Sequence, residues 1–198
     1  MNSSNGIHIV GILGSVRPGN YTSMALALVG DEVRRRGAGY QLLDPSALNL
    51  PLPGLGPESP GAQSLRETVA AATGVVFATP EYHGSFSSVT KLVIENLGFP
   101  SVLAGKPVAL LGVAGGVIGA VKSLEALAGV CMHVGALVLP GSVSVARVRE
   151  AFDLEGKCLN PEVEKRIRSV AANMLDYIGR SICPRLALEA MVRETARV

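Results

Sequence analysis

Short apolar runs that alternate with helical segments are the feature that most restricts the fold of this sequence. Five runs, mostly apolar on both faces and bounded by turns, lie at residues 7–12, 40–44, 75–78, 108–113 and 136–139. Helical patterns occupy the intervals, at residues 22–36, 64–72, 88–97 and 120–130. Runs of this kind are typical of parallel strands covered on both sides. The order predicts an α/β fold with an open, doubly wound sheet of five parallel strands.

The C-terminal part of the sequence predicts a connector followed by one more covering helix. Asn160 is a suitable N-cap and Pro161 suits the first helical position. An apolar stripe at helical spacing follows, formed by Val163, Ile167, Val170, Met174 and Ile178. A further helix is predicted over residues 186–198, and a long proline-rich loop over residues 45–60.

Length and composition exclude several classes of protein. A chain of 198 residues suits one domain, and we expect residues 1–198 to form it. With 48% hydrophobic residues and a net charge of +2, the chain is not of the disordered type and shows no sign of a nucleic-acid partner. Its three cysteines are too few and scattered for a disulfide framework, which predicts reduced thiols in the cytoplasm.

Two charge-poor stretches do not fit membrane segments. Residues 1–16 open with polar residues instead of a basic region, which does not fit a signal peptide. Residues 126–146 contain His133, Pro140 and Gly141, and divide better into a helix end and a strand. The basic run at residues 34–36 is interpreted as a solvated helix end. We therefore expect no membrane partner.

Ligands of open parallel sheets bind beyond the carboxyl ends of the strands, so we expect the functional residues in the loops after strands one, three and four. The first loop, residues 14–23, combines small and hydroxyl residues with Arg17 directly before a helix. Backbone N–H groups at a helix start and a guanidinium are what a phosphate requires. The loop lacks the signatures of a P-loop and of a Rossmann dinucleotide site. A plain capped loop with Arg17 in solvent is the alternative.

The second loop, residues 79–91, places Pro80, Tyr82 and Gly84 where the backbone can approach a flat ligand closely. His83 in this loop is interpreted as a hydrogen-bonding or stacking residue, because no nucleophile with a matched acid accompanies it. The histidines and cysteines lack the spacing of metal ligands, so no metal site is predicted.

The third loop, residues 114–120, is a glycine turn that leads into a helix. Taken alone this turn is a weak signal, because glycine at a tight turn is often only a steric requirement. Three loops rich in glycine or hydroxyl groups on one edge of the sheet together predict a pocket for a flat, phosphorylated ligand.

At this point the sequence resembles the NAD(P)H-dependent FMN reductases of the flavodoxin-like fold, which include quinone, chromate and azo-dye reductases. The motifs that carry the resemblance are Gly14-Ser15-Val16-Arg17 with Asn20 and Thr22, Pro80-Glu81-Tyr82-His83-Gly84-Ser85 with Lys91, and Gly115-Gly116-Val117-Ile118-Gly119. The chain departs from the family pattern at Asn20 and Thr22, at His83 in place of Asn, and at residues 87–88, where Pro-Gly is frequent.

The resemblance implies a flavodoxin-like three-layer sandwich whose sheet has the strand order 2-1-3-4-5. It implies FMN as the cofactor and NAD(P)H as the co-substrate, with no obligate catalytic side chain because hydride passes directly to the flavin. The implied phosphate-binding residues are Ser15, Arg17, Asn20, Tyr21 and Thr22, and the implied ring-binding residues are Pro80, Glu81, Tyr82, His83, Gly84, Ser85, Gly115 and Gly116. It further implies a homodimer or homotetramer, with helices near residues 91–97 and 120–130 in contact.

The activity that follows is transfer of two electrons from NAD(P)H through flavin to a small acceptor: free FMN, a quinone, chromate or an azo compound. Two alternatives stay open at this stage. One is an electron-transfer flavodoxin without NAD(P)H activity, and the other is a non-catalytic flavin-binding regulator on the same scaffold.

Overall fold

Five parallel strands form the middle layer of the computed structural model, which describes residues 6–55 and 58–195. The strands are β1 (His8–Leu13), β2 (Gly39–Leu43), β3 (Gly74–Tyr82), β5 (Pro107–Val113) and β6 (Leu137–Val138). Their spatial order is β2-β1-β3-β5-β6. Counted along the chain this is 2-1-3-4-5, so the predicted fold class and strand order are confirmed.

Two short strands were not predicted. β4 (Ser85–Phe86) folds back antiparallel on the end of β3, and β7 (Val143–Val145) pairs with β5. The fifth strand, predicted over residues 136–139, is reduced to β6, and β7 continues the same edge of the sheet after Pro140 and Gly141. Proline has no N–H for a ladder bond, and Gly141 adopts a φ of 87° that favours glycine.

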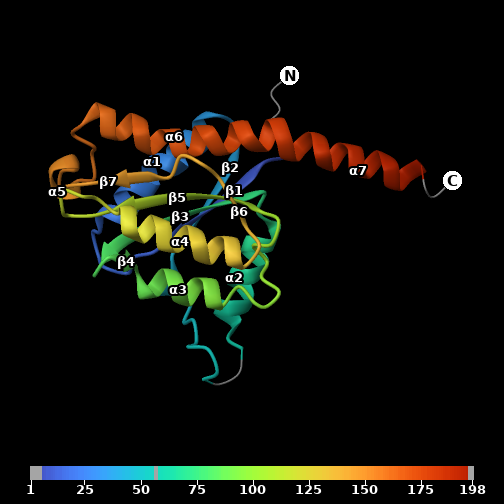
Figure 1. The fold of residues 1–198 in the computed structure, drawn as a ribbon, viewed down its shortest axis with the longest axis horizontal. Coiled ribbons are helices and arrows are strands. Elements are labelled where there is room, and N and C mark those ends of the chain that lie inside the picture. The colour runs from blue at the N-terminus through green and yellow to red at the C-terminus, as the bar shows by residue number, and fades with distance from the viewer. Residues whose placement is uncertain (1–5, 56–57, 196–198) are drawn as a thin grey trace.

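Helices cover both faces of the sheet (Figure 1). α1 (Tyr21–Arg35) and α6 (Pro161–Tyr177) lie on one face, and α2 (Pro60–Ala71), α3 (Ser88–Glu95) and α4 (Val121–His133) lie on the other. The core is correspondingly divided, because alternate residues of a strand point to opposite faces. In β1, Ile9 and Leu13 join the cluster under α1 and α6, whereas Val10 and Ile12 join the other.

The predicted proline-rich loop over residues 45–60 is shorter than expected at both ends. It opens with a 3-10 turn, η1 (Pro45–Ala47), and α2 begins at Pro60 instead of residue 64. The earlier start follows from local capping, because Ser59 accepts a hydrogen bond from Ala62 N at 3.1 Å and Pro60 supplies the fixed φ of a first helical position.

The last helices run almost as one rod. Asn160 caps α6 by accepting from the N–H groups of Glu162 and Val163, as the sequence predicts. A π-helical turn, η2 (Ile178–Ile182), joins α6 to α7 (Cys183–Thr195), which projects beyond the body (Figure 1). The predicted tail helix thus begins earlier than residue 186, and residues 196–198 lie outside the described part. Within the described ranges, no helix is long and apolar enough to span a membrane.

A buried carboxylate links α1 to α6. Glu32 has a side chain only 3% exposed, and it accepts hydrogen bonds from Arg35 and Arg36 at 2.7–2.8 Å. Arg168 of α6 lies 3.8 Å from the same carboxylate and also pairs with Asp31. Hydrogen bonding to Arg35, joined by Arg36, lowers the pKa of Glu32 to about 2 against the opposing effect of burial. The basic run interpreted as a solvated helix end therefore includes two structural ion pairs.

Replacing Glu32 with glutamine is expected to lower the free energy of unfolding at pH 7 by about 2–3 kcal/mol. A depressed carboxylate pKa contributes stability that is complete above the unfolded value near 4.5 and is lost as the pH falls toward 2. Denaturant unfolding of the wild type and of E32Q from pH 7 to pH 2 measures this difference. It should shrink below pH 5, whereas Asp31→Asn, at an exposed carboxylate, should cost less than about 1 kcal/mol.

Candidate functional site

The first loop connects β1 to α1 and presents unused hydrogen-bond donors. Ser15 is 3% exposed, and neither its hydroxyl nor its N–H has a partner among the described residues. Thr22, which is 1% exposed, likewise has a hydroxyl without a described partner. Because both residues line the pocket, these donors and acceptors are available to a ligand.

The side-chain amide of Asn20 makes hydrogen bonds within this loop. Its Oδ1 accepts from Ser23 N at 2.8 Å, and its Nδ2 donates to the carbonyl of Arg17 at 2.6 Å. The amide thereby caps α1 and leaves the N–H groups of Tyr21 and Thr22 without intrahelical partners. The first turn of α1 has no acidic residue, so its positive end is available to an anion.

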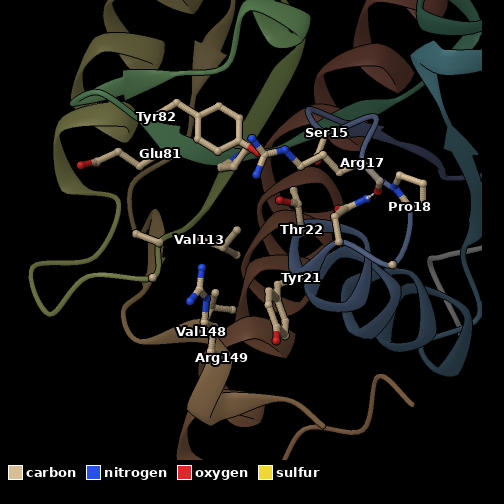
Figure 2. Close-up of a pocket in the computed structure, with 15 residues that line it drawn as sticks. Ser15, Arg17, Pro18, Tyr21, Thr22, Glu81, Tyr82, Val113, Val148 and Arg149 are labelled. Carbon is tan, nitrogen blue, oxygen red and sulfur yellow. Dashed lines mark hydrogen bonds between the residues drawn. The ribbon is translucent and has the colours of Figure 1, made fainter. Parts of the chain in front are cut away.

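Arg17 reaches from the first loop across to the second. Its guanidinium carbon lies 4.9 Å from the centre of the Tyr82 ring, and Figure 2 shows the two side chains together at one side of the pocket. No carboxylate among the described residues pairs with Arg17. The Tyr82 ring thus holds the guanidinium near the donors of the first loop, and its N–H groups remain available for hydrogen bonds to a ligand.

The second loop is a tight hairpin. β3 continues through Pro80 to Tyr82, four residues beyond the predicted strand, and pairs with β4 through Tyr82 and Ser85. The two turn residues, His83 and Gly84, have φ values of 52° and 76°. A two-residue turn with both φ angles positive favours Asn-Gly, and histidine is among the other residues that tolerate this region. His83 is exposed at the tip.

The side chain of Glu81 turns away from the pocket, as Figure 2 shows. Its carboxylate accepts from the N–H and the hydroxyl of Ser123, each at 3.2 Å. Ala120 at the start of α4 makes no side-chain cap, so Glu81 supplies the missing acceptor from another element. Glu81 therefore lines the pocket through atoms other than its carboxylate.

The third loop is tied to the segment after β7. Ala114 donates to Val145 O at 2.9 Å, Val148 donates to Ala114 O at 3.0 Å, and Arg147 donates to Gly116 O at 3.1 Å. These bonds bring the short helix α5 (Val148–Ala151) to the same end of the sheet. Arg149 therefore reaches the pocket, a placement that the sequence reasoning missed. Two arginines in three residues after the fifth strand were the available signal.

Together the three loops enclose a pocket of about 270 Å³ that is open to solvent. It is lined by Ser15, Arg17, Pro18, Gly19, Asn20, Tyr21, Thr22, Pro80, Glu81, Tyr82, Val113, Ala114, Gly115, Val148 and Arg149. Nine of these residues were predicted. Of the other predicted residues, His83, Gly84, Ser85 and Gly116 lie outside its lining, at the tips of the second and third loops. Across the described ranges, no cluster of His, Cys, Asp and Glu could hold a metal.

The pocket therefore combines positively charged and polar groups with apolar surface. Arg17 and Arg149 are its two guanidiniums, whereas Val113 and Val148 supply aliphatic surface. Its one carboxylate, that of Glu81, is already bound to Ser123. Such a pocket accommodates a flat molecule that carries a phosphate or another anionic group.

Comparison with known proteins extends this description. A family model described as NADPH-dependent FMN reductase matches residues 7–150. An NAD(P)H-dependent FMN reductase of Pseudomonas aeruginosa is 33% identical over 172 residues, which cover 83% of this chain and 91% of that protein. An NADPH azoreductase of a Bacillus species is 32% identical over 58% of this chain and 64% of its own length.

A solved structure shows the same fold. The flavoenzyme NAD(P)H:(acceptor) oxidoreductase FerB of Paracoccus denitrificans aligns with a TM-score of 0.72 at 23% identity. The alignment covers 87% of this chain and 97% of FerB.

Proposed function

Because the chain belongs to the NADPH-dependent FMN reductase family, we propose that FMN binds in the pocket with its phosphate on the first loop. The observation that carries this assignment is Ser15, which lines the pocket beside the positive end of α1 and whose hydroxyl and N–H have no described partner. Membership of this family favours an NAD(P)H-dependent oxidoreductase over an electron-transfer flavodoxin.

The residues present fit the phosphate of FMN. Ser15 and the N–H groups of Tyr21 and Thr22 offer donors, and Arg17 adds a fixed positive charge. Asn20 contributes by holding the loop through its two hydrogen bonds. In this proposal the phosphate accepts hydrogen bonds from these donors, which have no partner among the described residues.

The flavin ring is proposed to lie between the second and third loops. Pro80 and Tyr82 border one side, and Gly115 borders the other, where a Cβ would meet nothing within 4 Å. The predicted residues His83, Gly84, Ser85 and Gly116 stand at the tips of these loops, where they would border the ring from outside the present lining. The aliphatic surface of Val113 and Val148 suits a planar aromatic ligand.

When bound, FMN supplies hydride transfer from NAD(P)H and delivery of two electrons to an acceptor. The side chains of the pocket orient the ligands and provide positive charge, and none is required as an acid or base. Arg149 is well placed to attract the phosphates of NAD(P)H, because it lines the pocket without a described carboxylate partner.

The test of this function is direct. Purified protein supplied with FMN is expected to show flavin absorbance after removal of free flavin, and to oxidise NADPH or NADH when an acceptor is present. Free FMN, a quinone, chromate and an azo compound make the panel that identifies the acceptor. Protein that binds no FMN and oxidises neither nicotinamide would refute the proposal.

The proposed setting is a single FMN-binding domain, residues 1–198, in the cytoplasm. One sheet with both faces covered supports the single domain. The three cysteines, Cys131, Cys158 and Cys183, are all free thiols, which is usual in a reducing compartment.

The proposed assembly is a homodimer, or a pair of dimers, that meets through α3 and α4. An apolar groove of about 720 Å³ lies between these helices and includes Ile94, Phe99, Ala126 and Val130. Phe99 is 97% exposed at its edge. A second copy of the same face would cover this surface, and large exposed apolar patches commonly mark such contacts.

Ala126→Arg is expected to convert the dimer to a monomer, because a guanidinium at a residue that lines the groove would have to be buried in the contact between the two copies. Sedimentation velocity of the wild type and the variant measures the change. Glu125→Arg, on the same helix but outside the groove lining, is the matched control and should remain dimeric. A wild-type protein that sediments as a monomer would contradict the proposed assembly.

A further inference from the structure

Three buried hydroxyls of the second loop, residues 79–91, lie beside the first loop and outside the pocket lining. Thr79 is near the end of β3, Ser87 is the N-cap of α3, and Thr90 is in the first turn of α3. Thr79 and Thr90 are 0% exposed and Ser87 is 3% exposed. A polar cluster at this depth is stable only when its groups are hydrogen-bonded, so each bond of the cluster constrains the loops beside it.

Ser87 is the centre of this cluster. Its Oγ donates to the carbonyl oxygen of Gly14 at 2.6 Å and accepts from Thr90 N at 3.0 Å. No other described residue donates to the Gly14 oxygen. Ser87 N donates to Thr79 Oγ1 at 3.1 Å, and that hydroxyl donates to Pro80 O at 3.0 Å. Ser87 thus contacts the first loop at Gly14 and the end of β3 at Thr79.

The hydroxyl proton of Ser87 is donated to one acceptor. The Gly14 oxygen can only accept, so the proton of Ser87 lies on that bond. The hydroxyl of Thr90 lies within donating distance of both Ser87 Oγ, at 2.9 Å, and Thr79 Oγ1, at 3.3 Å. The proton of Thr79 is directed to Pro80 O. The protons of Ser87 and Thr79 therefore end on two backbone carbonyls, those of Gly14 and Pro80.

The bond to Gly14 also determines where Ser15 points. The carbonyl of Gly14 and the N–H of Ser15 belong to one planar trans peptide, in which the two groups point in opposite directions. Holding the carbonyl against α3 consequently directs the Ser15 N–H away from α3. That N–H has no described partner, and Ser15 lines the pocket.

We propose that Ser87 is a positioning residue for the phosphate of FMN: its buried hydroxyl fixes the Gly14–Ser15 peptide and presents the Ser15 N–H to the phosphate. The inference rests on the proposed FMN site. It assigns a function to a residue that cannot touch the ligand, and it explains why one hydroxyl links the phosphate loop with the strand end at Pro80.

The test compares the affinities of apo-protein for FMN and for riboflavin, which lacks the phosphate. Titration of flavin fluorescence gives both dissociation constants, and thermal unfolding without flavin reports the stability of each variant. Ser87→Ala and Ser87→Gly delete the hydroxyl, and glycine is also well accepted as an N-cap. Ser87→Thr keeps the hydroxyl. Ser88→Ala is the matched control, because Ser88 is exposed and makes no described side-chain hydrogen bond.

Both deletion variants are expected to raise the dissociation constant of FMN about tenfold, roughly the effect of one hydrogen bond, and that of riboflavin less than about twofold. Ser87→Thr and Ser88→Ala should retain the wild-type ratio of the two constants. A merely structural role would weaken both flavins equally, and an unchanged ratio in S87A and S87G would overturn the proposal. So would failure of both variants to fold without flavin. Wild-type protein that binds neither flavin would instead refute the FMN site itself.

Discussion

Replacing Gly14 with alanine is expected to destabilise the protein by about 3 kcal/mol and to abolish FMN binding. A Cβ at this position would lie 2.6 Å from the carbonyl oxygen of Ala78 and would also collide with Thr90 Oγ1. The Ala78 oxygen is backbone and accepts from Gly14 N at 2.7 Å, so it cannot withdraw without breaking this bond. The first loop must shift, and the donors of Ser15 shift with it.

Chemical denaturation and FMN titration measure the two consequences of G14A separately. Gly129→Ala is the control for the added methyl group, because a Cβ there meets nothing within 4 Å and the residue is in the interior of α4. This control should be as stable as the wild type or more stable by up to about 1 kcal/mol. A G14A protein with wild-type stability would show that the contact between the first loop and β3 is not constrained as described.

Replacing Arg17 with alanine is expected to weaken FMN binding by about 1.5–3 kcal/mol, the contribution of a charge-assisted hydrogen bond. The corresponding increase in the dissociation constant is roughly 10- to 150-fold. The fold should be unaffected, because Arg17 pairs with no described carboxylate and contacts Tyr82 at the pocket surface. Riboflavin should lose much less affinity than FMN, since it has no phosphate.

Arg34→Ala is the matched control for Arg17→Ala. Arg34 also lies over an aromatic ring, 5.0 Å from the centre of Tyr40, but at the far end of α1 from the pocket. Its removal takes away a similar cation–π contact and should leave the dissociation constant of FMN unchanged. Equal losses in R17A and R34A would mean that the effect of Arg17 is not local to the phosphate.

The sequence predicts the five strands and the three loops because their signals are local. Apolar runs and glycine turns are visible within a few residues, and they determine which loops meet at the carboxyl ends of the strands. Pro80 shows the limit of such reasoning. A proline at this position predicts a loop, yet Pro80 lies within β3. The strand tolerates it because the pairing of β1 with β3 ends at Ala78. Beyond that point β3 has a free edge, where the missing N–H costs no ladder bond.

Contacts between distant segments could not be predicted. Glu81 is a predicted cofactor-binding residue and lines the pocket, and its carboxylate caps α4 through Ser123, 42 residues away. Arg149 reaches the pocket because backbone hydrogen bonds join α5 to the third loop. Neither segment has a local sequence pattern that predicts this pairing. Both outcomes depend on the tertiary arrangement and not on local propensity, so a single sequence gives no sign of them.

The division of the fifth strand has a consequence for the behaviour of the protein in concentrated solution. An uninterrupted outer strand would expose a row of unpaired N–H and C=O groups, which can template pairing with another chain. Here β6 has two residues and β7 has three. Pro140, between them, carries no N–H, and Gly141 turns the chain. This sheet edge is therefore protected against strand-to-strand aggregation by its own backbone.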